Sequence, residues 1–302
     1  MTAAATPAAA AASTPGERLA IQMEQIVTKR IADDKLVLPS MPAVAAKCLE
    51  MLRNPEVEPR AAANLIEKDP VLAAQLLRLA NSALLGTREP ITKVLGAVTR
   101  VGTMRLRQFI LETTARKTFE SKDHQINACL RKIWEHSVAV ATLAGDVVAL
   151  ANAGDAETGY LAGLLHDIGK PIVASMLLEA EKTILGLKPS AGWIGSVEWL
   201  GVIHRTHRKI GIALSQKWGL GDSVCRAITD CEEYDSTERL CEANAVRFAN
   251  AVAKQNGFYE CDTNKDDNDA LIMIGQSLLG LDPKRLPQLV GSAQRAVDNL
   301  KF

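Results

Sequence analysis

A histidine and an aspartate stand side by side at the end of an apolar stretch, and both residue types are common metal ligands. The stretch Tyr160 to Leu165 is followed directly by His166 and Asp167, and then by Gly169 and Lys170. The apolar run predicts a buried helix, and we expect Gly169 to supply the left-handed conformation that ends it. An imidazole and a carboxylate on consecutive residues can both contact one divalent cation. Two ligands do not make a metal site, so other segments must supply the rest, or the pair is structural.

A second group of chemically active residues lies later in the chain, where His204 and His207 are three positions apart. Residues at this spacing share one face of a helix, so both rings could contact one ion. Arg205, Arg208 and Lys209 make this the most basic short segment of the chain, and it could attract a phosphate. A solvated helix surface is the favoured interpretation of these charges, because such side chains are rarely buried.

The elements that carry these residues are predicted to be helices. From about Arg18 onward nearly every segment has apolar residues at helical spacing, and alternating runs rich in β-branched residues are missing. The aromatic content of 4% also disfavours an all-β fold. One helix is predicted to begin at Asp69 and Pro70, a capping residue followed by proline in the first turn. Asn81 and Ser82 stand at its end, where they could bond exposed carbonyls or a neighbouring loop.

Two further helices are predicted on either side of the histidine–aspartate pair, at about 126–151 and 172–187. The first contains His136. A lone histidine on an amphipathic helix is most often a satisfied core or boundary residue, so the spacing alone does not make His136 a ligand.

The size and charge of the chain exclude several classes of protein. With 302 residues and 47% hydrophobic content, the chain can bury one large core or two smaller ones without disulfides. The 35 basic and 35 acidic residues balance, which argues against a general nucleic-acid binder. The six cysteines show no C-x-x-C spacing, so neither a zinc ribbon nor a disulfide framework is predicted.

The first 17 residues are rich in alanine and lack both a basic segment and large aliphatic residues. This stretch, residues 1–17, is predicted to be a disordered tail rather than a secretory signal or a membrane span. No later segment has 18 apolar residues without a charge. We therefore expect a soluble, cytoplasmic protein that does not associate with membranes.

Several motifs, in the same order, resemble those of the HDOD family, a group of bacterial signalling proteins related to the HD-domain and HD-GYP metal-dependent phosphohydrolases. The resemblance covers roughly residues 36–230 and is carried by Leu-Pro-Ser-Met-Pro at 38–42, Asp-Pro at 69–70, Leu-Leu-Arg-Leu-Ala-Asn-Ser at 76–82, Gly-Leu-Leu-His-Asp-Ile-Gly-Lys at 163–170, and Ala97, Gly102, His136, Glu198, His207, Gly211, Ala213, Leu214 and Trp218. It implies an all-α, multi-helix HDOD fold in which an N-terminal helical subdomain packs on an HD-like helical core. The expected HDOD domain is 18–235, with an N-terminal part at about 18–120 and an HD-like part at about 121–235. Residues 236–302 are expected to form a C-terminal helical extension.

The resemblance also implies where a metal ion would bind. In that family a histidine on the preceding helix faces the histidine–aspartate pair, so His136 is expected to join His166 and Asp167 as a ligand of one divalent transition metal ion. His207, four residues before a glycine, matches a family position and is the expected fourth ligand. The pattern does not require His204.

The chain departs from the HD-GYP pattern at other ligand positions. Where the pattern usually shows a pair of histidines, this chain has Cys231 and Glu232, and a later aspartate is replaced by Asn250. These replacements would remove two or three ligands from the bimetallic site of the HD-GYP enzymes.

Two functions follow from these observations. The favoured one is a stand-alone signal-transduction or regulatory module that acts through protein–protein interaction, with a degenerate metal site and no phosphohydrolase activity. The alternative is a metal-dependent phosphohydrolase for a nucleotide or cyclic dinucleotide, in which Asp167 would bridge the metal and Lys170 would steady the phosphate. A nucleotide ligand is compatible with both. Direct DNA binding through Arg205, Arg208 and Lys209 is the weakest hypothesis, because the net charge is zero.

Overall fold

The computed structural model describes residues 21–22, 24–26, 28–30, 33, 38–54, 56–82, 85–86, 89–121, 124–184, 197–259 and 264–300. The tail predicted at residues 1–17 lies outside these ranges. Every regular element within them is a helix, so the predicted all-α class is confirmed. In chain order the elements are α2 (Ala43–Met51), α3 (Pro59–Ile66), α4 (Pro70–Ala80), α5 (Val94–Val101), α6 (Thr103–Arg116), η2 (Lys117–Phe119), α7 (His124–Ala151), α8 (Ala156–Leu165), α9 (Gly169–Ile184), α10 (Val197–Lys217), α11 (Asp222–Asp230), α12 (Glu242–Gln255), α13 (Lys265–Leu279), η4 (Pro283–Arg285) and α14 (Leu286–Asp298).

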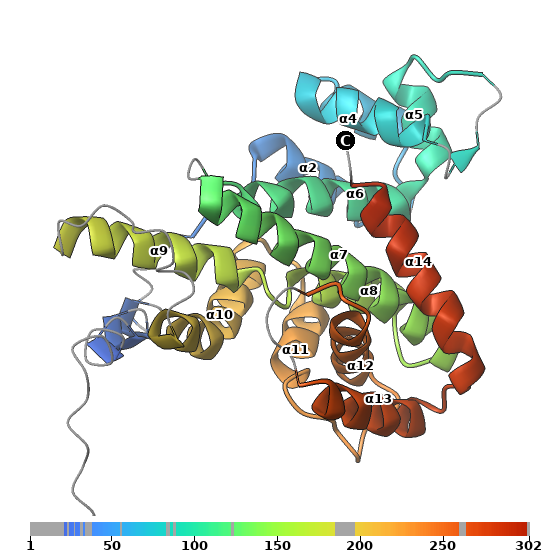
Figure 1. The fold of residues 1–302 in the computed structure, drawn as a ribbon. Helices are drawn as coiled ribbons and strands as arrows, with labels where there is room; N and C mark the ends of the chain where they lie inside the picture. Colours follow the sequence, from blue (N-terminus) through green and yellow to red (C-terminus); the bar gives the residue numbers. More distant parts are fainter. Residues whose placement is uncertain are drawn as a thin grey trace, which may run out of the picture.

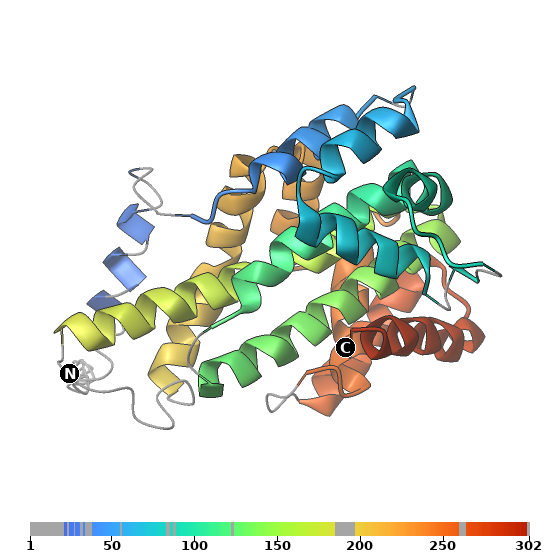
Figure 2. The same ribbon diagram turned by 90° about the horizontal axis from the view of Figure 1, so that it is seen from above.

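The helices α2 to α6 bury a core of their own. Its members are aliphatic residues and alanines, among them the fully buried Ile66, Leu76 and Ile110. These helices, coloured blue to teal, gather on one side of the molecule in both views (Figure 1, Figure 2). The apolar stripe that the sequence predicts along α4 is therefore the face that closes this core.

A larger core surrounds α7, which contacts α8, α12 and α14 (Figure 1). The cluster extends from Leu38 to Val297, so helices from the last third of the chain share it with the helices that carry the candidate ligands. In particular, α12 packs against both α7 and α8.

The segment that precedes α2 ties the two cores together. The side chain of Trp218 donates a hydrogen bond from Nε1 to the carbonyl of Pro39 over 3.1 Å, and Lys217 Nζ donates to the carbonyl of Leu38 over 2.9 Å. Proline at 39 and 42 keeps this segment extended. The end of α10 is thus fixed against the start of the N-terminal helices.

The helix predicted to begin at Asp69 does so. Asp69 Oδ1 accepts hydrogen bonds from the backbone N–H groups of Val71 and Leu72, at 3.0 and 3.1 Å. At the other end, Asn81 Nδ2 donates to the carbonyls of Leu77 and Ile91, and its Oδ1 accepts from the N–H of Ile91. Asn81 therefore does bond a neighbouring segment, and it connects the end of α4 to the residues before α5.

The expectation for Gly169 was wrong. Gly169 is not among the glycines with positive φ, and it begins α9 instead of ending α8. A Cβ at this position would overlap the backbone carbonyl of His207 on α10. Glycine is needed here because two backbones approach each other closely, and not because a helix ends.

Glycine has a similar role at the crossing of α7 and α8. A Cβ on Gly163 would lie 2.9 Å from the Cα of Ala141. The absence of a side chain lets α8 approach α7, and this approach brings the residue after α8, His166, close to His136 on α7.

Two stretches, Asn127–Ala151 and Ala156–Glu179, are long and apolar enough to cross a membrane by composition alone. Inside the fold they are 61% and 83% buried. The second stretch is also interrupted by the turn at 166–168. Their apolar composition is thus accounted for by the core that they form.

Candidate metal centre

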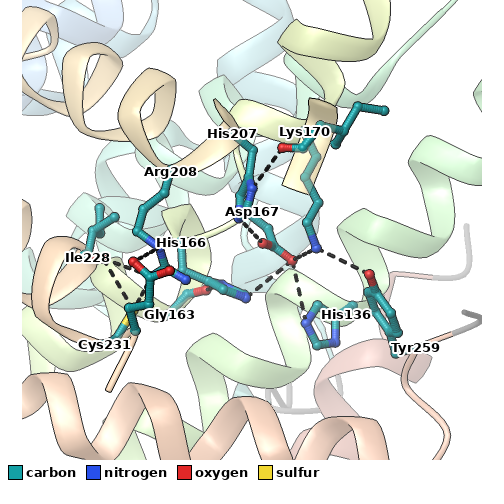
Figure 3. Close-up of polar contacts among 12 residues, drawn as sticks. His136, Gly163, His166, Asp167, Lys170, His207, Arg208, Ile228, Cys231 and Tyr259 are labelled. Atoms are coloured by element: carbon teal, nitrogen blue, oxygen red, sulfur yellow. Dashed lines mark hydrogen bonds and ion pairs between the residues drawn. The ribbon is translucent and has the colours of Figure 1, made fainter. Parts of the chain in front are cut away.

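Five polar side chains meet inside the larger core, where α7, α9, α10 and the turn after α8 come together (Figure 3). His136 lies on α7, His166 and Asp167 in the turn, Lys170 in the first turn of α9, and His207 on α10. None of the five has more than 9% of its surface exposed. In such an interior each charge needs a partner.

The carboxylate of Asp167 is the centre of this group, as Figure 3 shows. Its Oδ2 lies 2.6 Å from Lys170 Nζ, 3.3 Å from His166 Nε2 and 3.7 Å from His136 Nε2. Its Oδ1 lies 3.3 Å from His207 Nε2. The structure therefore brings together all four residues that the sequence names as candidate ligands, and it adds the Lys170 ammonium to them.

Backbone carbonyls orient two of the imidazole rings. His166 Nδ1 lies 2.7 Å from the oxygen of Gly163, and His207 Nδ1 lies 2.9 Å from the oxygen of Ile203. A carbonyl oxygen only accepts, so each Nδ1 donates, and the Nε2 position of each ring faces Asp167. A lone pair that faces a carboxylate requires a cation between them, either a proton or a metal ion. Metal-bound histidines are usually held by such a bond at the other ring nitrogen.

His136 is buried completely, and neither of its ring nitrogens has a hydrogen-bond partner among the described residues. Burial lowers its pKa well below the ordinary value of 6.5, and nearby His166 and Lys170 lower it further, while Asp167 opposes them. The ring is therefore neutral at neutral pH, with a free lone pair. A buried polar group without a partner costs about 1–3 kcal/mol, and a metal ligand role would satisfy this one.

The single carboxylate remains ionised. Burial alone would raise the pKa of Asp167, but His166 and the Lys170 ammonium hold it well below its ordinary value. Burial alone would lower the pKa of Lys170, but Asp167 and Tyr259 raise it. Asp167 and Lys170 thus form a charged pair in the interior.

The donors present fit one divalent transition metal ion. One ligand atom each from His136, His166 and Asp167 lie within 4.8 Å of one another. His207 is outside that set and approaches the opposite carboxylate oxygen. Imidazole nitrogens with one carboxylate suit the transition metals better than calcium or magnesium, which prefer oxygen ligands only.

Tyr259, just after α12, is a part of the site that the sequence did not reveal. Its ring lies 4.9 Å from the ring of His136, and its hydroxyl accepts a hydrogen bond from Lys170 Nζ over 3.3 Å. The ammonium groups of Lys170 and Lys254 lie 5.0 and 5.3 Å from its ring centroid. A single tyrosine near a helix end carries no pattern that could have predicted this position.

The basic segment of α10 is divided between the surface and the interior. Arg205 is exposed and pairs with Glu24 over 2.8 Å, and Lys209 is exposed as well. Arg208 instead turns inward, toward Cys231. His204 is exposed beside His207, with their ring centroids 5.8 Å apart. These residues form neither one surface nor one ligand set.

Cys231, Glu232 and Asn250, which the family resemblance places at further HD-GYP ligand positions, have three different surroundings. Cys231 Sγ accepts a hydrogen bond from Arg208 Nη1 over 2.9 Å and donates to the carbonyl of Ile228 over 3.3 Å (Figure 3). Glu232 is exposed and lies 3.7 Å from Arg208 Nε. The side-chain oxygen of Asn250 is buried and has no partner among the described residues. Within the described part of the chain, His136, His166 and Asp167 form the one group of three such donors at metal-binding distance.

Comparison with known proteins gives one family and several related structures. The family model described as HDOD domain matches residues 38–234. Among curated proteins, an uncharacterized protein of Treponema pallidum (strain Nichols) is 26% identical over 218 residues, which make up 69% of this chain and 40% of the relative. The chain thus spans well under half the length of that relative.

Several solved structures share the fold. A protein of Shewanella amazonensis SB2B, described as "Putative metal-dependent phosphohydrolase", aligns with a TM-score of 0.67 and 21% identity, covering 94% of this chain and 100% of its own. A protein of Marinobacter aquaeolei VT8, described as "Putative signal transduction protein", gives a TM-score of 0.66 and 21% identity over 94% of this chain and 65% of its own. An HDOD domain protein of Geobacter sulfurreducens aligns with a TM-score of 0.60 and 17% identity, covering 91% of this chain and 99% of its own. At these identities the likeness concerns the fold alone.

Proposed function

The chain belongs to the HDOD domain family, and from this we propose that it is a regulatory module of a signal-transduction pathway that acts through a protein partner and does not hydrolyse phosphate esters. The proposal includes one divalent transition metal ion held by His136, His166 and Asp167, with His207 beside them. It places the protein in the cytoplasm, with neither a membrane nor a nucleic acid as its partner. The fold that it shares with a structure described as a signal transduction protein supports this reading.

The observation that carries the proposal is the number of donors. The described residues supply one group of three donors, whereas Cys231 and Asn250 stand where the HD-GYP pattern has further ligands. The sulfur of Cys231 accepts a hydrogen bond from Arg208, and the positive charge of Arg208 would repel a second metal ion. Asp167, the one carboxylate that the described residues place at the centre, is already paired with Lys170. The chain's own groups thus support one ion that ties helices together, as in a structural site.

The arrangement of Lys170 beside Asp167 favours one second candidate, a metal-dependent phosphohydrolase, which is also how the Shewanella amazonensis structure is described. A bound divalent ion would supply a Lewis acid and a water of lowered pKa. The chain would contribute three oriented donors and an ammonium able to hold a phosphate oxygen. Against this, the five groups at the centre are at most 9% exposed, which leaves a substrate little access.

Elemental analysis combined with a turnover assay tests the proposal. We expect untagged protein to carry about one equivalent of a transition metal, and His166→Ala to lose it. Glu67→Ala is the control, because Glu67 is an exposed potential ligand at the end of α3, outside the site, and its loss should leave the metal content unchanged. With excess manganese, neither a phosphodiester nor a phosphomonoester should be hydrolysed by any of these proteins.

Two results would overturn the proposal. Turnover by wild-type protein that disappears in Asp167→Asn would establish the phosphohydrolase instead. Absence of any metal after purification and after reconstitution with manganese, zinc or iron would remove the ion from the proposal.

A further inference from the structure

The face of α12 that turns toward the metal centre carries positive charge. Arg247, Asn250 and Lys254 follow one another at spacings of three and four, so they share one side of the helix. This helix packs against α7 and α8, which lead to His136 and His166. The charged residues of α12 are therefore neighbours of the Asp167 cluster.

Among the described residues, Lys254 has no anionic side chain in direct contact. No carboxylate of the described residues lies at ion-pair distance from its ammonium, which rests 5.3 Å from the ring centroid of Tyr259. Burial lowers the pKa of Lys254, and Lys170 and Arg247 lower it further, while the more distant Asp167 carboxylate opposes them without reversing the direction. The surroundings thus disfavour its charge, as expected for a site that lacks its anion.

The guanidinium groups of Arg208 and Arg247 also lack a close carboxylate partner among the described residues. Arg208 Nη1 donates to the carbonyl of Ile228 over 3.1 Å and to Cys231 Sγ. The carboxylate of Glu232 lies 3.7 Å from Arg208 Nε, and the Glu232 side chain is 74% exposed. Arg247 makes one long bond of 3.5 Å to the carbonyl of Cys231, and its guanidinium stacks over the ring of Tyr234.

On this face of α12, two buried polar atoms have no hydrogen-bond partner among the described residues. They are Nε of Arg247, a donor, and Oδ1 of Asn250, an acceptor. Asn250 lies between Arg247 and Lys254 on the shared face, so a group above its amide is within reach of both long side chains. The Asn250 amide also offers a donor through Nδ2.

Four cations, Lys170, Lys254, Arg208 and Arg247, surround this region, and two carboxylates, Asp167 and Glu232, oppose them. A divalent metal ion at Asp167 would add to the excess. Buried charge of one sign is costly unless an ion of the opposite sign accompanies it. An anion bound on the α12 side of the centre would balance this excess of positive charge.

We propose that this face is a phosphate-binding site, in which Lys254 and Arg247 hold a phosphate group over Asn250. The group is either free inorganic phosphate or the phosphate of a small phosphomonoester. A phosphate offers several oxygen acceptors and up to two charges, which suits a guanidinium fork and an ammonium together. The inference deepens the proposed function, because the phosphate would be a signal sensed beside the metal centre rather than a substrate cleaved there.

Isothermal titration calorimetry with inorganic phosphate and with adenosine monophosphate tests the site, in a buffer of low chloride. The full chain is titrated both after chelation of metals and after loading with manganese. Wild-type protein should bind inorganic phosphate in both states, and more tightly with manganese. Lys254→Met should weaken binding about tenfold or more, because a charge-assisted contact is lost, while Lys254→Arg should retain it. Lys265→Met, an exposed lysine at the start of α13, is the matched control and should bind as wild type does.

Asn250→Asp provides a second variant, since a carboxylate at the centre of the site should repel phosphate while adding a potential metal ligand. Equal affinity for phosphate and the nucleotide would assign recognition to the phosphate group alone, and tighter nucleotide binding would assign it to a phosphomonoester. The proposal is overturned if wild-type protein binds neither at millimolar concentration, or if Lys254→Met binds as wild type. Binding to the metal-free protein depends only on side chains, so its failure is distinct from loss of metal or from phosphodiester turnover, which bear on the proposed function.

Discussion

The ammonium of Lys170 lies 2.6 Å from Oδ2 of Asp167, the same carboxylate oxygen that faces the Nε2 atoms of His136 and His166. The same oxygen thus pairs with the Lys170 ammonium and belongs to the proposed metal site. The ammonium stabilises the buried carboxylate when no metal is bound, and it repels a metal ion when one arrives.

This shared oxygen predicts opposite effects of Lys170→Met on folding and on metal binding. Without metal, the variant removes the ammonium partner of the buried Asp167 carboxylate, so we expect a loss of about 3–5 kcal/mol in the free energy of unfolding. For manganese we expect an affinity at least about tenfold higher than that of wild type, because a like charge near the ion has been removed. Urea denaturation of chelated protein and calorimetric titration with manganese measure the two effects.

Lys209→Met is the control for this experiment, since Lys209 is exposed on α10 and should change neither quantity appreciably. A parallel fall in stability and in manganese affinity would show that Lys170 supports the geometry of the site rather than competing for its charge.

The contact between Gly169 and the backbone of His207 predicts that Gly169→Ala is strongly destabilising. The added methyl group would overlap a backbone carbonyl, which cannot move aside as a flexible side chain can. We expect a loss of about 3 kcal/mol, together with weaker metal binding because α9 and α10 would separate. Thermal denaturation and metal titration report the two effects.

Gly211 on α10 offers a matched substitution at the same crossing. A Cβ there would meet its nearest neighbours at 3.5 Å, an ordinary contact. Gly211→Ala should therefore be neutral or should stabilise the protein by up to about 1 kcal/mol, through the higher helix propensity of alanine. Equal destabilisation by both substitutions would argue against a specific contact at Gly169.

Much of this centre could be predicted from the sequence, because the relevant signals are local. Helical spacing predicted the all-α class, and the Asp69–Pro70 pair predicted the start of α4. The doublet of His166 and Asp167 identified the turn on which the site is built. The pairing with His136 and His207 came from a family resemblance, since nothing in the spacing places α7 and α10 against that turn.

The parts that could not be predicted depend on contacts distant in the sequence. Gly169 was expected to end a helix because glycine often does so, yet the close approach of His207 explains it. Tyr259 and Lys254 reach the centre only because α12 packs on α7 and α8. Both residues lie beyond the end of the matched family region at 234.

The hydrogen bonds of Asn81 predict that Asn81→Ala destabilises the N-terminal helices. Its side chain bonds Leu77 and makes two bonds to the backbone of Ile91, so three hydrogen bonds are lost at once. We expect a loss of about 1–3 kcal/mol in the free energy of unfolding, because the backbone groups of Ile91 remain close to water and recover part of their bonding. Asn256→Ala, which loses a single bond to Val252, is the comparison and should cost less. Equal losses would mean that the link to Ile91 contributes nothing.

The lowered pKa of His136 predicts that the metal-free protein loses stability on mild acidification. In the unfolded chain this histidine takes up a proton near its ordinary pKa of 6.5, whereas in the folded protein it stays neutral to a much lower pH. Between these two pKa values the unfolded state binds more protons, so the free energy of unfolding falls as the pH falls, by about 1.4 kcal/mol per pH unit for one such group. Asp167 adds nothing in this range, because its lowered pKa affects stability only below its ordinary value of 3.8.

Urea denaturation of chelated protein at about pH 6.5 and about pH 5.5 measures this loss. His136→Leu removes the titrating group and keeps a buried apolar side chain, so its stability should fall less over the same interval, by about 1 kcal/mol, because the unfolded-state histidine is already half protonated at the upper pH. All other histidines are common to the two proteins, and their contributions cancel in the difference. An equal loss in wild type and variant would show that His136 is not held neutral, and would remove the argument that its free lone pair is available to a metal ion.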